Sequence, residues 1–465
     1  MDLGASTGID MEEQMVILDI GIDYTKVGLS KDSTPRQILK TPLSISSIIR
    51  LKDEIGPLTL VDIMKESKKV KHEIHEFLYE VFIIHCLLKT KGSKICILEQ
   101  LIFPRSFMQS LAEVLYLEFE FSKVYFFLAD LLPLYTTGLD SGIMVDCGFL
   151  HTSVTPVVQT IFTIKGKKHS YFGGAALEQD LKAQMKLENP GNEKYITNTL
   201  IKDVICKVLK TLSRKQFDAF FATEESIEKM KQKKYPLSEM SRRYEALSMS
   251  YHTIAGTMEC FFDQGGTDQY INIAHMVLDC LLELEESDRT LAAQNIIPSG
   301  GLFMIPGMHR RLLGELQYSV ENIDKYKGLI GLKDKFRVEN SIYPANILAW
   351  VGASLLSCLN EEVDMFLISK GEFEKDCKGI LPDRFGHCFL TCSRNMEIPE
   401  DPPVEEGKEQ LEDIKFKVPE TKRPENYFNI QFEEMNKKRK ELLYSSATPY
   451  STRAINRSKG FVFPR

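Results

Sequence analysis

The sequence predicts an α/β protein built from two halves of similar design, because one short motif occurs twice. Ile17–Gly21 (ILDIG) and Met144–Gly148 (MVDCG) are each an apolar, strand-like run that ends in Asp-x-Gly, and more strand-like sequence follows each one. A glycine after a strand lets the chain turn tightly and present backbone N–H groups to a phosphate. An aspartate just before that glycine can hold a hydrated divalent cation. We therefore expect an internally duplicated fold that clamps a nucleotide between its halves.

Length and charge set the broad class of the protein. A chain of 465 residues is too long for one ordinary core and suits two or three domains. Its formal charge of −7 gives it no general affinity for nucleic acid. It has no uncharged apolar run of about 18 residues, so no transmembrane helix is predicted. Residues 1–14 are acidic and lack an apolar core, so we expect a flexible leader there rather than a signal peptide.

The spacing of apolar residues divides the chain into the two expected halves. The first half covers residues 15–141, with residues 343–392 returning to it. The second half covers residues 142–342 and has an outer lobe at about 180–270. The strands expected in the first half are 16–20, 26–30 and 94–99, and the helices expected along the chain are 72–88, 106–119, 175–185, 274–284, 306–318 and 346–359.

The last part of the chain differs in composition from the rest. Residues 393–465 hold seven of the 19 prolines and are dense in Glu and Lys. Such a segment cannot bury enough apolar surface to offset its chain entropy, so we expect a disordered, charged, Pro-rich tail. Just before it stand Cys377, His387, Cys388 and Cys392. No second close-spaced pair of ligands accompanies them, so we expect no zinc site.

Five segments carry a resemblance to a known family. Val16–Gly28 resembles the first phosphate loop of actin, Leu134–Gly148 the segment entering its second phosphate loop, and Ile297–Arg310 its adenosine loop. Trp350–Ser354 and Ile368–Phe373 match two late segments in the same order. The chain is therefore identified as a member of the actin superfamily. The resemblance implies the actin fold: duplicated ribonuclease-H-like halves, divided into four subdomains, around a nucleotide cleft.

The resemblance also implies a set of nucleotide-binding residues, most of which shape the backbone or anchor charge. ATP or ADP with Mg²⁺ is the implied cofactor, with Asp19 and Asp146 as the carboxylates that would hold the Mg²⁺ and no other metal expected. The implied residues are Asp19, Gly21, Lys26, Asp146, Gly148, Gly173, Gly174, Lys202, Gly300 and Gly301.

Departures from the actin pattern predict that the chain is not an enzyme. Ile22 and Asp23 replace a serine and a glycine of the first loop, and Phe149 and Leu150 replace an aspartate and a glycine of the second. Ala129 stands where actin has the glutamine that positions the attacking water, and alanine cannot orient a nucleophile. Two explanations of the retained glycines stay open: the turns of the fold need them, or a nucleotide still binds.

The first half has a reduced outer lobe at about 35–72. Its Ile48–Leu51 and Leu58–Val61 segments predict short strands, and little sequence is left for the long loop with which actin reaches the next subunit toward the pointed end. A subunit without that loop can join a filament end and accept nothing beyond it. The chain thus resembles the pointed-end actin-related protein of dynactin (the actin-related protein 10/11 class).

That branch implies partners and a location. The partners would be dynactin's filament-forming actin-related protein and the other pointed-end subunits, in a heteromeric cytoplasmic complex of the cytoskeleton that supports dynein-driven transport along microtubules. Neither nucleic acid nor membrane insertion is implied. The alternative is a nuclear actin-related subunit of a chromatin-remodelling complex, for which Lys437–Lys440 (KKRK) is the one candidate import signal.

Overall fold

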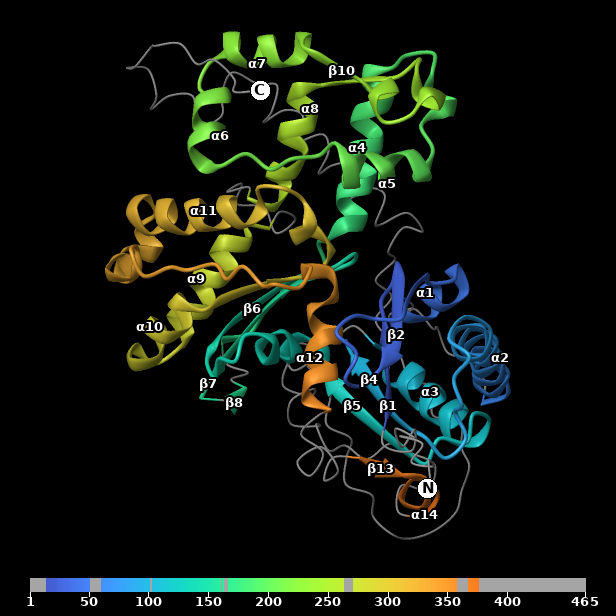
Figure 1. Ribbon diagram of the computed structural model, residues 1–465. Helices are drawn as coiled ribbons and strands as arrows, with labels where there is room; N and C mark the ends of the chain where they lie inside the picture. Colours follow the sequence, from blue (N-terminus) through green and yellow to red (C-terminus); the bar gives the residue numbers. More distant parts are fainter. Residues whose placement is uncertain are drawn as a thin grey trace, which may run out of the picture.

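The computed structural model describes residues 14–50, 60–100, 103–159, 161–162, 166–262, 271–357 and 367–375. Two large sheets, each with helices packed against it, organise these residues, and a third sheet has only two strands (Figure 1). The predicted leader, the predicted tail and the cysteine and histidine residues near it lie outside the described residues, apart from Gln14. None of the described helices is long and apolar enough to cross a bilayer.

The first half contains a six-stranded sheet in the order β13-β5-β4-β1-β2-β3. Its central strand β1 is buried along its whole length, as expected for a strand covered on both faces. The strands are β1 (Met15–Ile20), β2 (Tyr24–Leu29), β3 (Gln37–Lys40), β4 (Lys94–Glu99), β5 (Lys123–Leu128) and β13 (Ile368–Ser369). The helices are α1 (Leu43–Arg50), α2 (Leu60–Tyr79), the π-helix η2 (Glu80–His85), α3 (Arg105–Leu117), the 3-10 helix η3 (Ala129–Thr136), α12 (Leu348–Leu356) and α14 (Lys370–Lys375).

The second half contains a five-stranded sheet in which β12, β6, β7 and β8 follow one another and β9 pairs with β7. Figure 1 shows α4 to α8 as an upper lobe above α9, α10 and α11. The strands are β6 (Gly142–Cys147), β7 (Thr152–Val158), β8 (Ile161–Phe162), β9 (Lys168–Ser170) and β12 (Ile296–Ser299), with β10 (Lys234–Pro236) and β11 (Ser248–Ser250) paired in the lobe. The helices are α4 (Gly174–Glu188), α5 (Asn198–Lys207), α6 (Arg214–Phe220), α7 (Glu224–Gln232), α8 (Tyr251–Gly256), α9 (Ile273–Glu283), α10 (Glu286–Gln294) and α11 (Met308–Asn322). The shorter 3-10 helices are η5 (Glu193–Tyr195), η6 (Leu237–Glu239), η7 (Arg242–Tyr244), η8 (Thr257–Phe261), η9 (Gly301–Met304), η10 (Asp324–Leu332) and η11 (Ala345–Ile347).

Strand register confirms the duplication that the repeated Asp-x-Gly motif predicts. In the first half, β1 and β2 form an antiparallel hairpin in which Asp19 faces Lys26, and β1 pairs in parallel with β4. In the second half, β6 and β7 form a matching hairpin in which Asp146 faces Ser153, and β6 pairs in parallel with β12. Each aspartate therefore occupies the same place before its turn.

Helix α12 lies against the first half although it comes late in the chain (Figure 1). The Trp350 indole Nε1 donates to the Ile17 carbonyl oxygen at 3.2 Å, and Trp350 is fully buried. At Gly352 a Cβ atom would lie 1.9 Å from the Leu132 carbonyl oxygen. The helix can approach η3 this closely only because residue 352 has no side chain.

The two strands predicted at Ile48–Leu51 and Leu58–Val61 are wrong. Leu43–Arg50 forms α1, and α2 begins at Leu60, while residues 51–59 lie outside the described residues. The burial pattern shows the reason: Ile45 and Ile49 are buried while Ser47 between them is exposed, whereas a strand would place all three on one face. The helix predicted over 72–88 likewise begins earlier and changes to a π-helix for its last turn.

Candidate functional site

The first turn is held by hydrogen bonds from the outer lobe of the first half. Thr41 Oγ1 donates to the Gly21 carbonyl oxygen at 2.7 Å, and Ser46 Oγ donates to the Ile22 carbonyl oxygen at 2.6 Å. Within the turn, the Gly21 N–H donates to the Tyr24 carbonyl oxygen at 3.1 Å. The Ile22 side chain is buried in the apolar cluster of the first half. Position 22, where the resemblance implies a phosphate-facing hydroxyl, thus carries a buried apolar side chain.

Lys26 and Asp19, both predicted site residues, form an ion pair with each other. Lys26 Nζ lies 2.6 Å from Asp19 Oδ2, and their side chains are 15% and 5% exposed. The pair neutralises the negative charge beside the first turn. A phosphate or a cation would therefore compete with a contact that the chain already makes.

The second turn is stabilised by the start of α4. The Gly174 N–H donates to the Gly148 carbonyl oxygen at 3.0 Å, and the Ala175 N–H donates to the Phe149 carbonyl oxygen at 2.7 Å. A Cβ on Gly173 would lie 2.7 Å from the Gly148 carbonyl oxygen. These contacts account for Gly148, Gly173 and Gly174 as parts of one tight junction between the turn and the helix.

Asp146 stands half-buried near the end of β6 and accepts a hydrogen bond from Ser299 Oγ at 2.9 Å. Burial raises the pKa of Asp146, and the nearby Asp130 carboxylate raises it further, while His151 and the Ser299 hydroxyl oppose this. Two carboxylates are predicted to hold Mg²⁺. Asp146 fits a hydrated cation better than Asp19 does, because Asp146 is bonded to the Ser299 hydroxyl whereas Asp19 is paired with the Lys26 ammonium. Among the described residues, no group of three or more His, Cys, Asp or Glu residues is arranged to hold a metal ion.

A buried ion pair beside Asp146 was missed by sequence reasoning. Lys167 Nζ lies 2.8 Å from Asp130 Oδ2, and the two side chains are 3% and 5% exposed. Burial would raise the pKa of Asp130, but the charges of Lys167 and His151 outweigh it and lower that pKa to about 2. Thr155 Oγ1 also donates to this carboxylate at 3.2 Å. The sequence signal that could have identified this ion pair was Asp130, a single charged residue inside the apolar run that follows Phe126.

Glu99 is a second residue that sequence reasoning missed. It ends β4 and pairs with Leu128, directly before Ala129, while its neighbour Leu98 pairs with Asp19. Burial raises the pKa of Glu99 to about 7. Carboxylates at the carboxyl ends of parallel strands gather at one edge of a sheet, and this rule was the signal that could have identified it.

The glycines of the third segment have different structural roles. Gly300 has φ +94°, and a Cβ there would lie 2.3 Å from the Cys147 carbonyl oxygen. The fold itself therefore requires glycine at this position. Gly301 is exposed, and a Cβ there would meet no atom within 4 Å. Packing explains Gly300 and leaves Gly301 without a packing reason.

Lys202, predicted to bind nucleotide, contacts the first turn across the cleft. Its Nζ atom lies 2.6 Å and 2.5 Å from the two carboxylate oxygens of Asp23. The same atom lies 5.5 Å from the ring centroid of Tyr24 and 5.4 Å from that of Phe149. The lysine thus joins α5 of the second half to the β1–β2 turn of the first.

The three positions predicted to correspond to actin's hydrolytic groups are apolar. Ala129 is buried with the side chains that surround Trp350. Phe149 and Leu150 pack against the apolar cluster of the first half, to which Ile22 belongs. No polar side chain stands at Ala129, Phe149 or Ile22 to position a water molecule.

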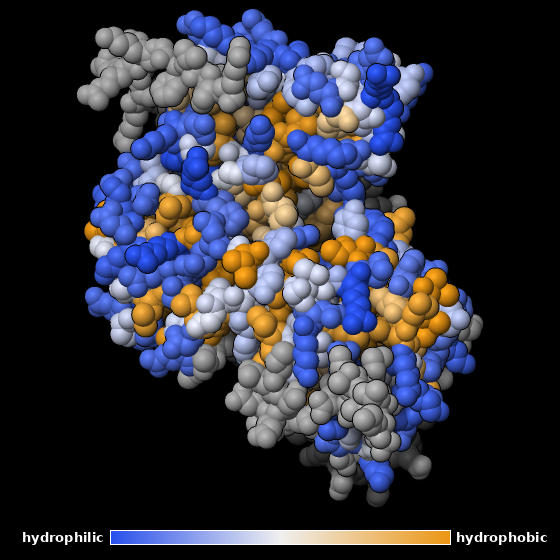
Figure 2. Space-filling model, viewed as in Figure 1, coloured by the Kyte–Doolittle hydropathy of each residue, from blue (hydrophilic) through white to orange (hydrophobic). Residues whose placement is uncertain are grey.

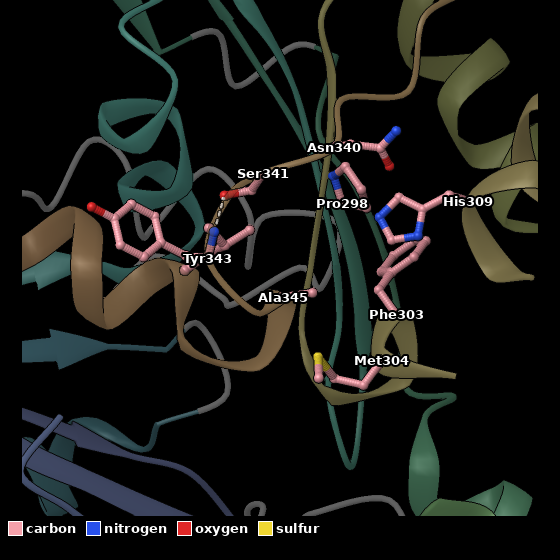
Figure 3. Close-up of a pocket in the computed structure, with 9 residues that line it drawn as sticks. Pro298, Phe303, Met304, His309, Asn340, Ser341, Tyr343 and Ala345 are labelled. Carbon is pink, nitrogen blue, oxygen red and sulfur yellow. Dashed lines mark hydrogen bonds between the residues drawn. The ribbon is translucent and has the colours of Figure 1, made fainter. Parts of the chain in front are cut away.

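A cavity of about 240 Å³ lies beside the third segment and not between the two turns. Figure 3 shows Phe303 and His309 on one side of it and Ser341 and Tyr343 on the other. The rings of Phe303 and His309 are 5.5 Å apart, and burial lowers the pKa of His309. None of the predicted site residues lines it; the lining residues are Pro298, Phe303, Met304, His309, Asn340, Ser341, Tyr343, Ala345 and Leu348.

Comparison with known proteins gives two kinds of match. The family model described as Actin matches residues 10–232 and 189–385. Actin-related protein 10 of Dictyostelium discoideum is 26% identical over 401 residues, which cover 75% of this chain and 83% of that protein. Actin-related protein 2 of Saccharomyces cerevisiae is 22% identical over 410 residues, covering 77% and 95%. Actin-related protein 2 of Schizosaccharomyces pombe is 22% identical over 403 residues, covering 78% and 96%.

These matches agree with the geometry. The residues that the family model matches make up most of the chain. They include both hairpins, the third segment and α12. The α/β fold with its two related halves is the one that the repeated Asp-x-Gly motif predicts, and the predicted superfamily is confirmed. The chain belongs to the actin family.

Proposed function

We propose that the chain is a non-catalytic actin-related subunit that caps the pointed end of dynactin's actin-related filament. It docks the other pointed-end subunits and supports dynein-driven transport along microtubules in the cytoplasm. The observation that carries the non-catalytic part is that Ile22, Ala129 and Phe149 are apolar and packed where actin positions phosphate and water. The similarity to Actin-related protein 10 of Dictyostelium discoideum supports a place among the actin-related proteins.

The outer lobe of the first half supports the capping role. Only residues 41–59 separate the end of β3 at Lys40 from the start of α2 at Leu60, and the described residues among them include the helix α1. In actin a long loop from this lobe reaches the next subunit toward the pointed end. A subunit that offers a compact lobe instead can join the filament and end it.

ATP or ADP with Mg²⁺ has a structural role in this proposal. A ligand that binds the native state stabilises it by mass action, whether or not it is hydrolysed. Asp146 and Gly301 are the predicted site residues that suit such a ligand, because the first carries a carboxylate bonded to a hydroxyl and the second leaves open space. Their part would be to position the nucleotide between the halves.

Affinity purification tests the partners. The full chain, tagged and expressed in cells, is expected to recover dynactin subunits, including its filament-forming actin-related protein. Mass spectrometry with label-free quantification identifies the recovered proteins, and an unrelated tagged protein gives the background. Recovery of chromatin-remodelling subunits without dynactin would instead favour the nuclear alternative and overturn the capping role.

A single-turnover assay tests the loss of hydrolysis. The purified chain is mixed in excess over radiolabelled ATP with Mg²⁺. Phosphate is expected to be released no faster than in buffer alone, because Ala129 cannot orient water. Actin assayed in parallel shows that the conditions support hydrolysis, and the nucleotide retained after gel filtration reports binding separately. Phosphate release above background at a rate proportional to the amount of protein would refute the non-catalytic role.

A further inference from the structure

The two halves contact each other through charged groups beside the first turn. Asp23, in the first turn, receives Lys202 from α5 of the second half and also pairs with Lys40 of β3. The Asp23 and Lys202 side chains are 15% and 27% exposed, so water screens their attraction only in part. Asp23 and Lys202 stand 179 residues apart in the sequence. Their contact therefore depends on how the halves are placed.

Aromatic rings from both halves enclose the same ammonium group. Tyr24 belongs to the first turn and Phe149 to the second, and Lys202 Nζ lies 5.5 Å and 5.4 Å from their ring centroids. A cation within about 6 Å of an aromatic ring centroid is attracted to the ring. The ammonium thus contacts both turns at once.

Apolar packing continues the contact below the charged layer. Phe149 and Leu150 of the second turn pack against the apolar cluster of the first half. Burial of such side chains stabilises whatever arrangement brings them together, at about 25 cal/mol for each Å² of apolar surface removed from water. Figure 2 shows apolar surface in the hollow between the upper lobe and the first half, consistent with an apolar boundary there.

We propose that Asp23, Tyr24, Phe149 and Lys202 form a cleft clasp that holds the two halves closed without a nucleotide. In this arrangement the Asp23 carboxylate and the Lys202 ammonium connect the two turns. A bound phosphate and its cation would otherwise make that connection. The clasp uses the same residues that depart from the actin pattern in the two loops, Asp23 and Phe149. The presence of Asp23 and Phe149 in place of the actin residues therefore provides a contact between the halves as well as removing a catalytic group.

Hydrogen–deuterium exchange on the full chain tests the clasp. The protein is first treated with apyrase and EDTA, and exchange is followed in peptides that cover residues 21–24 and 148–151. The wild type is expected to exchange slowly without nucleotide, and Mg-ADP or Mg-ATP should slow its exchange by no more than about twofold, because the clasp already holds the halves closed. Lys202→Met removes the ammonium and is expected to speed exchange in both peptides by about threefold to tenfold. Lys202→Arg keeps a cation that can pair and stack, and is expected to exchange like the wild type.

A matched control lies on the same helix. Lys207 pairs with Asp203 at 2.7 Å on the exposed side of α5, so Lys207→Met removes a lysine without touching the clasp and should leave both peptides unchanged. Thermal melting of each variant shows that it is folded. Two results would overturn the clasp: nucleotide-free wild type exchanging as fast as Lys202→Met, or Mg-ATP slowing exchange of the wild type severalfold. Cleft closure and filament capping are separate properties, and exchange reports only the first.

Discussion

Lys167→Met is expected to lower the free energy of unfolding by about 3–5 kcal/mol, because it leaves the buried Asp130 carboxylate without its cation. The pKa of Asp130 is lowered to about 2, against an ordinary value of 3.8. Its ionised form therefore stabilises the native state fully above about pH 3.8, and that stabilisation is lost as the pH falls through about 2. Urea unfolding at pH 7 consequently measures the whole effect.

Two further variants separate the lost ion pair from lost packing. Lys229→Met breaks an exposed pair with Glu225, whose side chains are 72% and 78% exposed, and should cost no more than about 1 kcal/mol. Replacing both buried partners, as in Lys167→Met with Asp130→Leu, should recover much of the loss, because no unpaired buried charge remains. A cost below about 1 kcal/mol for Lys167→Met alone would show that the pair is not buried in solution.

Gly300→Ala is expected to destabilise the fold by about 3 kcal/mol or more. The residue has φ +94°, a backbone region that L-residues rarely adopt, and the new Cβ would lie 2.3 Å from the Cys147 carbonyl oxygen. Relief of that overlap requires the end of β12 to move away from the end of β6. Thermal or urea unfolding of the purified variant measures the loss, and poor recovery of soluble protein would accord with it.

Gly301→Ala is the matched comparison. A Cβ at residue 301 would meet no atom within 4 Å, so the free energy of unfolding should change by no more than about 0.5 kcal/mol. Any effect on the retention of ATP or ADP by this variant would then reflect the ligand and not the fold. Equal destabilisation by both substitutions would contradict the separate roles that the geometry gives these two glycines.

Ion pairs within the chain are the common physical basis of the Lys167→Met prediction and of the proposed clasp. Three carboxylates each have an ammonium partner from the chain itself: Asp19 with Lys26, Asp130 with Lys167, and Asp23 with Lys202. Such pairs reduce the repulsion that would otherwise require a cation or push the carboxylates to protonate. These pairs accord with the proposed clasp between the halves and with the proposed non-catalytic role.

Sequence patterns predicted the parts of the fold that depend on local chemistry. The repeated Asp-x-Gly motif, with strand-like sequence on both sides, predicted two hairpins, and the registers of Asp19 with Lys26 and Asp146 with Ser153 confirm them. The pattern failed in the outer lobe, where short apolar runs fit a strand or a helix equally well. There the burial of Ile45 and Ile49, with Ser47 exposed between them, shows the period of a helix and agrees with α1.

By itself, the sequence determined the duplicated α/β design and its turns, and it predicted the loss of hydrolytic side chains, because each depends on residues that are near neighbours in the chain. Only the tertiary structure decided what the remaining charged residues contact. Lys202 faces Asp23 across 179 residues, and Lys167 reaches Asp130 across 37. No local pattern specifies such pairs, since they form only when the packing of separate elements brings the two charges within about 3 Å of each other.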